Sequence, residues 1–357
     1  MKKPTPIDVL VIGLGPAGAA AAAAVAAAGH SVIGLDRREQ AGIPVQCAEF
    51  VPSLIGLEVA DLSASIRQSI EGMITYVERE EGDHSPDFRG VMISRADFDR
   101  DLVHRARDAG VDCRFSTPVR AIAADGAVEL ATGEIIRPRI IIGADGPRSL
   151  VGRALGQVNE DCVESRQITV PLLQPHNATD IFLSAAFPGG YGWLFPKGDV
   201  ANLGIGLAPS WKDQLKPLLE QLHQRLVADG RVGSEVLGLT GGLIPVGGML
   251  RAVGHLGQTQ VFLAGDAAGL ANPITGAGIS AAVISGTMAG RAAASLLAGR
   301  DRAAEDFREE LGDLFGPSLA RALKRRQALL DCYARNELPQ TDDLRVGWIA
   351  YPEYWAV

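Results

Sequence analysis

The sequence predicts an α/β protein in which a Rossmann-type domain carries an inserted antiparallel-sheet domain and is followed by a short helical region. Three patterns support this: an N-terminal strand–helix–strand unit, alternating strand-like runs between residues 162 and 246, and a charged helical stretch after residue 301. A chain of 357 residues is long enough for two cores. The expected boundaries are residues 1–70, 92–160 and 247–300 for the Rossmann-type domain, 71–91 and 161–246 for the inserted domain, and 301–357 for the helical region.

The N-terminal unit has the pattern of a βαβ motif. Residues 8–12 form a short apolar run rich in Val and Ile, which is typical of a buried parallel strand. Residues 17–28 are almost entirely alanine, the best helix former, and Gly29 ends this helix. Residues 31–35 are the next strand. The small side chains of the helix predict close packing against the sheet.

Later segments give weaker patterns. We expect helices at residues 95–109, 211–229 and 279–298. Strands are expected at residues 111–115, 119–123, 140–142, 168–173, 181–186, 203–207 and 261–264, with a hairpin formed by residues 128–130 and 134–136.

Composition excludes some classes of protein. The chain has 34 Lys and Arg against 42 Asp and Glu, a net charge of −8, which argues against a nucleic-acid-binding protein. The four cysteines are scattered without C-x-x-C spacing, so we expect neither a disulfide framework nor a zinc site, and a reducing cytoplasm. The histidines show no ligand spacing, and no metal site is expected.

The N-terminus superficially resembles a signal peptide, because Lys2 and Lys3 precede an apolar run. Asp8, Pro16 and the glycines within that run favour a phosphate-binding turn instead. No stretch reaches the roughly 18–20 apolar residues of a spanning helix. We therefore expect no transmembrane segment, although peripheral contact with a membrane stays open.

Gly13-x-Gly15-x-x-Gly18 follows the first strand directly and opens the alanine-rich helix, with Pro16 and Ala17 in its first turn. Glycines let backbone N–H groups approach a pyrophosphate, and the helix N-terminus adds positive potential. Asp36 ends the second strand, where a carboxylate can accept hydrogen bonds from a ribose. These residues predict a bound dinucleotide, and at this point both NAD and FAD fit.

A second glycine-rich junction favours FAD. A predicted strand ends at Gly265-Asp266, where the carboxylate could bond the ribityl chain, and a loop then opens another small-residue helix. A helix N-terminus aimed at the flavin would stabilise its anionic reduced form, and an NAD site needs no such element. The expected cofactor residues here are Gly265, Asp266, Pro273, Gly276, Ala277, Gly278 and Ile279.

Together these pieces resemble the p-hydroxybenzoate-hydroxylase-type flavoproteins. Arg95-x-x-Phe98-Asp99-x-x-Leu102 is similar to the family's helix whose arginine lies beside the cofactor, and residues 142–149 resemble its Asp-Gly motif. The resemblance covers roughly residues 5–300 in ordered pieces. It implies FAD contacts from Arg37, Cys47, Ala48, Arg95, Val119, Ala144, Asp145 and Gly146, in addition to the two motifs above.

One segment resembles the geranylgeranyl reductases within that group, which saturate isolated double bonds of polyprenyl chains. Pro188-x-x-Tyr191-x-Trp193-x-Phe195-Pro196 fits their P-x-x-Y-x-W-x-F-P pattern, which lines the substrate site. Residues at every second position of a strand share one face, so the three aromatic rings could wall an apolar pocket. Ordinary core packing is the alternative.

Residues 42–49 resemble the family's cysteine-bearing segment near the flavin. Cys47 is therefore a candidate proton donor, a spectator, or a partner for a distant thiol such as Cys332. Glu49 is a candidate for a proton relay or a surface carboxylate. The chain has no second G-x-G-x-x-G motif, so electrons would come from transiently bound NAD(P)H or a reduced ferredoxin-type protein.

The C-terminal region departs from the resemblance, because polyprenyl reductases usually carry a longer one. Four aromatic residues, Trp348, Tyr351, Tyr354 and Trp355, stand in the last ten positions. They could pack over the substrate opening, dock a partner or touch a membrane interface. The basic cluster at residues 324–326 is expected to be a solvated helix face that could also meet anionic lipid.

The leading functional hypothesis is an FAD-dependent reductase of C=C bonds in an apolar, isoprenoid-like substrate. The second is an auxiliary flavoprotein that passes electrons to a partner enzyme, for example in lipoate or other cofactor assembly. The third is an aromatic monooxygenase, which the Tyr-Trp-Phe segment and Cys47 disfavour.

Overall fold

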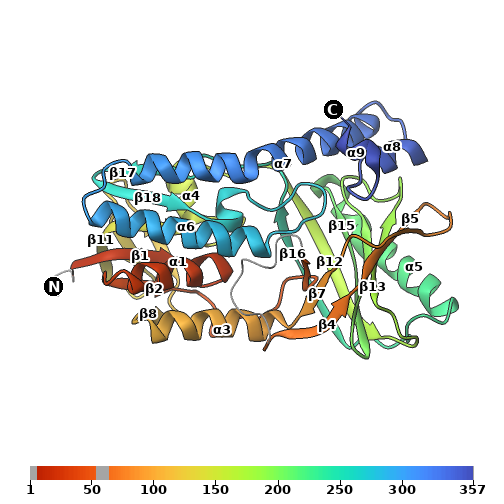
Figure 1. The fold of residues 1–357 in the computed structure, drawn as a ribbon, viewed down its shortest axis with the longest axis horizontal. Helices are drawn as coiled ribbons and strands as arrows, with labels where there is room; N and C mark the ends of the chain where they lie inside the picture. Colours follow the sequence, from red (N-terminus) through yellow and green to blue (C-terminus); the bar gives the residue numbers. More distant parts are fainter. Residues whose placement is uncertain (1–5, 54–63, 357) are drawn as a thin grey trace.

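The computed structural model describes residues 6–53 and 64–356. Two β-rich halves lie at opposite ends of an elongated molecule, and one long helix runs along both (Figure 1). The half that holds the N-terminus, called the N-terminal half below, contains an eight-stranded sheet, and the other half contains a seven-stranded sheet. A third, small sheet has three strands.

The eight-stranded sheet has parallel strands at its centre. Its strands, in spatial order, are β17 (Val253–Leu256), β18 (Thr259–Leu263), β11 (Ile135–Gly143), β1 (Pro6–Ile12), β2 (Val32–Leu35) and β8 (Asp112–Arg114), with β10 (Val128–Leu130) and β9 (Val119–Ile122) attached to β11. β1 pairs with β11 and β2 in parallel, and its apolar side chains from Val9 to Ile12 are buried. The predicted βαβ unit is confirmed.

The predicted hairpin is confirmed, because β10 pairs with the start of β11. The strands expected at 134–136 and 140–142 are, however, one continuous nine-residue strand, β11, which passes through Pro138. A strand tolerates proline where its missing N–H donor is not needed.

A row of helices covers the eight-stranded sheet in the order α3 (Arg95–Asp108), α1 (Pro16–Ala27), α6 (Ile279–Leu297) and α7 (Ala303–Ala334). α1 and α6 approach so closely that a Cβ at Gly286 would overlap the carbonyl of Ala17, and one at Gly290 that of Ala21. Only glycine permits such backbone contact. The short α4 (Leu150–Ala154) contacts β9 and β11.

Five strands of the seven-stranded sheet come from residues 162–245, and the two at one edge come from residues 72–85. Its order is β16 (Gly238–Pro245), β12 (Cys162–Pro171), β15 (Val200–Leu207), β14 (Gly192–Lys197), β13 (Ala178–Leu183), β5 (Gly72–Val77) and β6 (Asp83–Ser85). The predicted helix at 211–229 is divided into a 3-10 turn, η1 (Pro209–Gln214), and α5 (Leu215–Ala228). The apolar face of α5 packs on this sheet with residues such as Leu194 and Leu203.

The three-stranded sheet has the order β3 (Phe50–Pro52), β7 (Gly90–Ile93) and β4 (Ile66–Ile70). β7 leads into α3, and the chain around β3 follows residues 42–49 directly. The small sheet therefore connects the cysteine-bearing segment to the helix that carries Arg95.

The C-terminal region is helical, as predicted. α7 packs Phe307, Leu311 and Leu319 into the core of the N-terminal half, and its far end places Leu329 against the seven-stranded sheet. α8 (Thr341–Val346) and α9 (Pro352–Trp355) then fold back over that end. Within residues 6–53 and 64–356, no helix combines the length and the apolarity needed to cross a lipid bilayer.

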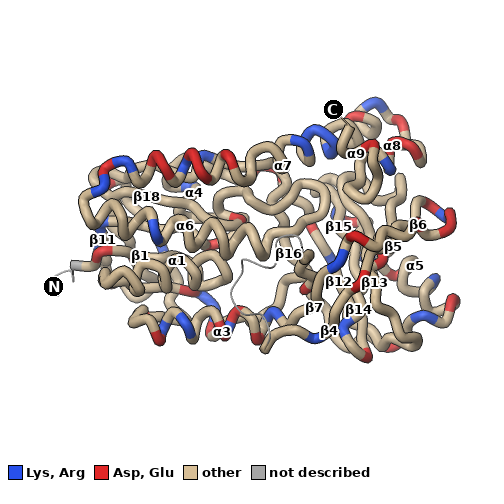
Figure 2. The backbone as a smooth tube through the Cα atoms, viewed as in Figure 1, with Lys and Arg blue, Asp and Glu red and all other residues tan. Residues whose placement is uncertain are grey.

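Charge is distributed unevenly over the helices. Lys, Arg, Asp and Glu are frequent on α3 and α7, whereas α1 carries none and α6 only Arg291 (Figure 2). The two uncharged helices form the inner pair of the row, which is consistent with their burial.

Replacing Gly286 by Ala is expected to destabilise the protein by about 1–3 kcal/mol, because the new methyl group must push α6 away from α1. Gly312→Ala in α7 is the matched control. A Cβ there meets no atom within 4 Å, so helix propensity should make that change neutral or stabilising by up to about 1 kcal/mol. Urea unfolding of both variants would check this, and equal stabilities would contradict the close contact.

Candidate functional site

The turn between β1 and α1 contains three glycines with different roles. A Cβ at Gly13 would overlap the carbonyl of Ala144, and one at Gly18 would overlap the carbonyl of Gly13, so the fold itself requires both. At Gly15, by contrast, the only atom of residues 6–53 and 64–356 within 4 Å would be Nη2 of Arg38 at 3.8 Å. The open space beside Gly15 fits a pyrophosphate that approaches the backbone.

The N-terminus of α1 is free to meet an anion. Its N-cap is Gly15, no side chain caps it, Pro16 stands in the first turn, and that turn has no acidic residue. α3 and α4 differ, because Ser94 and Ser149 cap them with their hydroxyl groups. The free N–H groups and the helix dipole of α1 would hold negatively charged phosphates.

Asp36 lies at the end of β2, as predicted, but its carboxylate is already engaged. It accepts hydrogen bonds from the N–H of Leu14 at 2.8 Å and from the guanidinium of Arg38, 2.8 Å away. Burial raises the pKa of Asp36, but Arg38 and Leu14 outweigh it and hold that pKa below its ordinary value. Arg37, a predicted cofactor contact, is exposed, and the next residue, Arg38, contacts Asp36.

The second glycine-rich junction runs from β18 through η2 (Gly265–Ala268) to α6. The N–H of Gly265 donates to Oγ of Ser285, and Oδ1 of Asn272 accepts from Ile274 and Thr275. The N-cap of α6 is Gly278, with no side-chain cap and no acidic residue in the first turn. Pro273, Gly276, Ala277 and Ile279 belong to the same loop and helix start. A second open helix N-terminus therefore stands where the flavin was expected.

Asp266 begins this junction beside α6. Burial raises the pKa of its carboxyl group to about 6, although the positive charge of Arg95 opposes the shift. Cβ of Gly278 would lie 3.3 Å from its Oδ1. The structure thus brings Asp266, Arg95 and the α6 N-terminus together, although they are far apart in sequence.

Arg95 occupies the first turn of α3. Its guanidinium forms a two-bond ion pair with Asp99, at 2.9 and 3.1 Å. Burial pulls the pKa of Arg95 down, but the charge of Asp99 and a contact with the nearby Cys47 hold it above its ordinary value. Arg95 is therefore a fixed positive charge next to Cys47.

Cys47 and Ala48 are held by their backbone groups. Nε2 of Gln167 donates to the carbonyl of Cys47 at 3.2 Å, and Nδ2 of Asn202 donates to that of Ala48 at 3.2 Å. The N–H of Glu49 points at Sγ of Cys47, 3.2 Å away. Cys47 and Cys332 are both free thiols in the structure.

Glu49 is not a surface carboxylate. It is buried with a left-handed backbone (φ 69°), and its Oε1 accepts from the N–H of Arg95 at 2.9 Å. Its Oε2 accepts from Asn202 at 3.0 Å and from the ammonium group of Lys197. These contacts join the cysteine-bearing segment to α3 and to the seven-stranded sheet, so Glu49 has a clear structural function.

Lys197, Asn202 and Gln167 were not predicted as site residues. They lie on three strands of the seven-stranded sheet, more than 100 residues from Glu49 along the chain. Their polar side chains inside otherwise apolar strands were the available signal, because a buried polar group needs a partner.

The Asp-Gly motif has a local structural role. Oδ2 of Asp145 accepts from the N–H of Leu150, and its Oδ1 accepts from Ser149 at 2.5 Å, so the carboxylate fixes the start of α4. Gly146 has a φ of 82°, and a Cβ there would meet open space. Ala144 packs against the glycine turn. Val119 begins β9. Two residues earlier, the N–H of Thr117 donates a hydrogen bond to the carbonyl of Asp36.

The three aromatic residues near β14 share one face of the seven-stranded sheet, as predicted. Tyr191, Trp193 and Phe195 belong to one hydrophobic cluster, whereas Leu194 between them packs toward α5. Nε1 of Trp193 donates to Gln167 at 3.0 Å, which in turn holds Cys47. The aromatic face is therefore turned toward the cysteine-bearing segment.

These rings are more enclosed than an open pocket wall. Trp193 and Phe195 are 6% and 5% exposed, and Pro196 is buried in its strand. Tyr191 lies against the ring of Trp348 at 4.8 Å, and its hydroxyl donates to the carbonyl of Thr275 at 2.6 Å. Tyr191 thus connects the aromatic face, the α6 loop and the C-terminal region.

The basic cluster before the C-terminus is not a solvated face, which corrects the prediction. Arg325 donates to the carbonyls of Glu353 and Tyr354, and Arg326 is 3% exposed. Lys324 alone of the three is exposed. Helical periodicity places consecutive residues on different faces, and here Arg325 meets the C-terminal residues of α9 while Arg326 meets Gly189 and Asp161.

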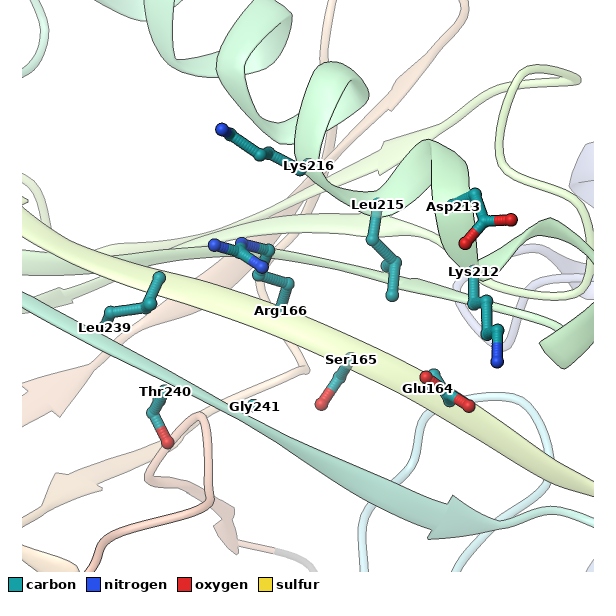
Figure 3. A pocket seen from close by; sticks show the side chains of 10 residues that line it. All are labelled: Glu164, Ser165, Arg166, Lys212, Asp213, Leu215, Lys216, Leu239, Thr240 and Gly241. Carbon is teal, nitrogen blue, oxygen red and sulfur yellow. The ribbon is translucent and has the colours of Figure 1, made fainter.

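A wide cleft of about 600 Å³ lies apart from these residues (Figure 3). Its side chains come from β12, β16, η1 and the start of α5, as Figure 3 shows. Glu164 and Arg166 line it, whereas Gln167, the next residue of β12, does not line it and instead holds Cys47. The cleft therefore opens on the opposite face of the sheet from Cys47.

The fold, the two glycine-rich turns and the uncapped N-termini of α1 and α6 are together typical of an FAD-binding oxidoreductase. A family model for an FAD binding domain matches residues 6–180, and one for a geranylgeranyl reductase catalytic domain matches residues 159–244.

Curated relatives extend over most of the chain. Digeranylgeranylglycerophospholipid reductase 2 of Methanopyrus kandleri is 33% identical, covering 89% of this chain and 85% of the relative. The digeranylgeranylglycerophospholipid reductase of Methanocella arvoryzae is 32% identical, with coverages of 90% and 87%. The chain belongs to the geranylgeranyl reductase family of FAD-dependent oxidoreductases, and that prediction is confirmed.

Solved structures share the fold. A geranylgeranyl bacteriochlorophyll reductase-like protein from Thermoplasma acidophilum has a TM-score of 0.79 at 24% identity and covers 99% of this chain and 98% of its own. PqsL from P. aeruginosa, solved with 2-aminobenzoylacetate, has a TM-score of 0.73 at 20% identity, with coverages of 95% and 98%. The predicted fold class, including its helical C-terminal region, is confirmed.

Replacing Asp266 by Asn is expected to stabilise the FAD-free protein at neutral pH by on the order of 2 kcal/mol. The folded-state pKa of about 6 lies above the ordinary value of 3.8, so the wild type loses stability as pH rises between these values. The advantage of the variant should therefore be full above pH 6 and disappear near pH 4. Urea unfolding of the FAD-free protein at several pH values measures it.

Asp313→Asn, on an exposed position of α7, is the matched control and should leave stability unchanged at every pH. Asp266→Asn should also retain less FAD on purification, because the ribityl chain would lose its carboxylate acceptor. A constant difference between pH 4 and pH 8 would show that Asp266 is not a strained buried acid.

Proposed function

We propose that this protein reduces carbon–carbon double bonds of an apolar, isoprenoid-like lipid. The observation that carries the proposal is the aromatic face of Tyr191, Trp193 and Phe195, which is turned toward Cys47 and adjoins the α6 loop. An apolar substrate held on this face would lie beside the predicted flavin site. Its relatives are named for lipids that carry geranylgeranyl chains, which supports the same substrate class.

FAD, when bound, would supply a hydride to one carbon of the double bond, and the protein would supply orientation, charge and a proton. The open N-termini of α1 and α6 would hold the pyrophosphate and the flavin edge. Arg95 adds a fixed positive charge near Asp266 and Cys47. We assign the remaining predicted contacts, from Arg37 to Ile279, to cofactor binding on the strength of their motifs.

Cys47 is the proposed proton donor to the second carbon. Its backbone is fixed by Gln167, and its thiol is near Arg95, which would stabilise the thiolate left after proton transfer. Glu49 supports this segment through its contacts to Arg95, Lys197 and Asn202 rather than by reaching the substrate. It is a positioning residue in this proposal.

The electron donor is proposed to be NAD(P)H that binds transiently, or a reduced ferredoxin-type protein. A lipid substrate also implies contact with a membrane surface, and Trp355 and Leu338, which are 52% and 64% exposed, are placed at the C-terminal end where such contact could occur. Both points follow from the proposed substrate class.

Anaerobic reoxidation of the reduced flavin tests the proposed function. A lipid with geranylgeranyl chains should restore the oxidised flavin spectrum, and mass spectrometry should show one H₂ added per reduced bond. A flavin that stays reduced with every polyprenyl lipid but transfers electrons to a ferredoxin-type protein would establish the electron-transfer role instead. Rapid reaction with oxygen and a hydroxylated product would establish a monooxygenase.

Cys47→Ala should slow reoxidation by the lipid about 100-fold, the usual scale for losing a general acid, with FAD content unchanged. Cys332→Ala, on α7, is the matched control and should keep the wild-type rate. Single-turnover stopped-flow absorbance measures both. If Cys47→Ala reoxidises at the wild-type rate, water or another group donates the proton.

A further inference from the structure

A narrow cavity separates the aromatic face from the C-terminal helices. It lies between residues 189–191, the α6 loop at Pro273 and Ile274, and the side chains of α7 and α8. Most of its walls are apolar, with Leu183, Leu329 and Leu344 among them. Its volume of about 40 Å³ corresponds to roughly three water-sized spheres, which suits a small polar group better than a ring.

Two polar groups in this apolar cavity have no partner. Nη2 of Arg326 and Nε1 of Trp348 are both buried, and neither makes a hydrogen bond within the described parts of the chain. Each residue is 3% exposed. Both residues line the same small cavity, and two unsatisfied donors beside it indicate a missing acceptor, because buried polar groups are otherwise paired.

The remaining contacts of Arg326 leave much of its charge unbalanced. Its Nη1 donates to the carbonyl of Gly189, and its Nε lies 3.5 Å from Asp161, a carboxylate that is 40% exposed. Burial lowers the pKa of Arg326, which shows that these contacts do not fully replace water. An anion in the cavity would satisfy both the charge and the free N–H.

A guanidinium and an indole N–H together select a ligand with several acceptor oxygens. Arg binds phosphate and carboxylate groups with strong, charge-assisted hydrogen bonds, and the indole can only donate. The apolar walls select against a free hydrated anion and favour one attached to an apolar chain.

The cavity adjoins the proposed reaction site. Tyr191 and Ile274 line it, and the Tyr191 hydroxyl donates to Thr275 in the loop that opens α6. The ring centroid of Trp348 lies 4.8 Å from that of Tyr191. An apolar chain attached to a group in the cavity would therefore begin beside Tyr191, which belongs to the same cluster as Trp193 and Phe195.

We propose that Arg326 and Trp348 bind the anionic phosphate or carboxylate head of the apolar substrate, so that the C-terminal helices position its chain. This inference rests on the proposed function, because the ligand is the same lipid-like molecule. The head group is anchored on the side of Tyr191 that faces the C-terminal helices, and the double bond to be reduced lies on the other.

Binding to the FAD-loaded, oxidised protein tests the inference without any turnover. Calorimetry with geranylgeranyl phosphate and with geranylgeraniol compares the same chain with and without the anionic head. The phosphate should bind at least about ten-fold more tightly, the usual contribution of one hydrogen bond to a charged group. Inorganic phosphate alone should bind far more weakly than either.

Trp348→Phe removes the indole N–H and keeps an aromatic ring beside Tyr191. It should weaken binding of the phosphate about ten-fold and leave binding of the alcohol unchanged. Trp211→Phe is the matched control, because Trp211 packs on Tyr333 and does not line the cavity. Arg326→Gln should cause a larger loss, with FAD content and the unfolding temperature reported to exclude misfolding.

The outcomes separate the two proposals. If both prenyl ligands bind equally and Trp348→Phe changes neither, the head-group site is wrong, while reduction of geranylgeraniol still decides the proposed function. If neither prenyl ligand binds, both proposals fail. If inorganic phosphate binds as tightly as geranylgeranyl phosphate, the cavity takes a free anion, and the lipid head-group site is overturned.

Discussion

The backbone contact between α1 and α6 is the constraint on which the cofactor half depends. Gly286 and Gly290 allow α6 to lie against the carbonyls of Ala17 and Ala21, a distance that no larger residue permits. The pairing of Gly286 with Ala17 and of Gly290 with Ala21 makes the two helices parallel, so their uncapped N-termini point in the same direction. Packing of alanine and glycine thus orients two positive helix ends toward the same end of the helix pair.

Glu49 connects this half with the seven-stranded sheet. One buried carboxylate receives hydrogen bonds from α3, through Arg95, and from two strands, through Lys197 and Asn202. Burying an ion pair costs desolvation free energy that the contact itself offsets only partly, so its value lies in fixing geometry. The geometry it fixes is that of Cys47, two residues away.

The sequence was sufficient where the determinants are local. The glycine turn, the second glycine-rich junction and the alternation of Tyr191, Trp193 and Phe195 depend on residues close together in the chain, and the structure places them as expected. Lys197 was missed, and Arg326 was expected on a solvated helix face. Both contact residues that are more than 100 positions away in the chain, and such contacts leave no local pattern in the sequence. The contact of Arg38 with Asp36 was not predicted, because turn geometry decides which side chain returns to the carboxylate.

The long helix α7 has a consequence for how such a protein can diverge. One end is part of the core beneath the cofactor half, and the other carries Leu329 and Arg326 to the cavity beside Tyr191. Changes in α8, α9 and the end of α7 can therefore alter which molecules are accepted without disturbing the glycine turns at the opposite end. Catalysis and substrate choice would then depend on separate segments of one chain that α7 connects, and these segments could evolve at different rates.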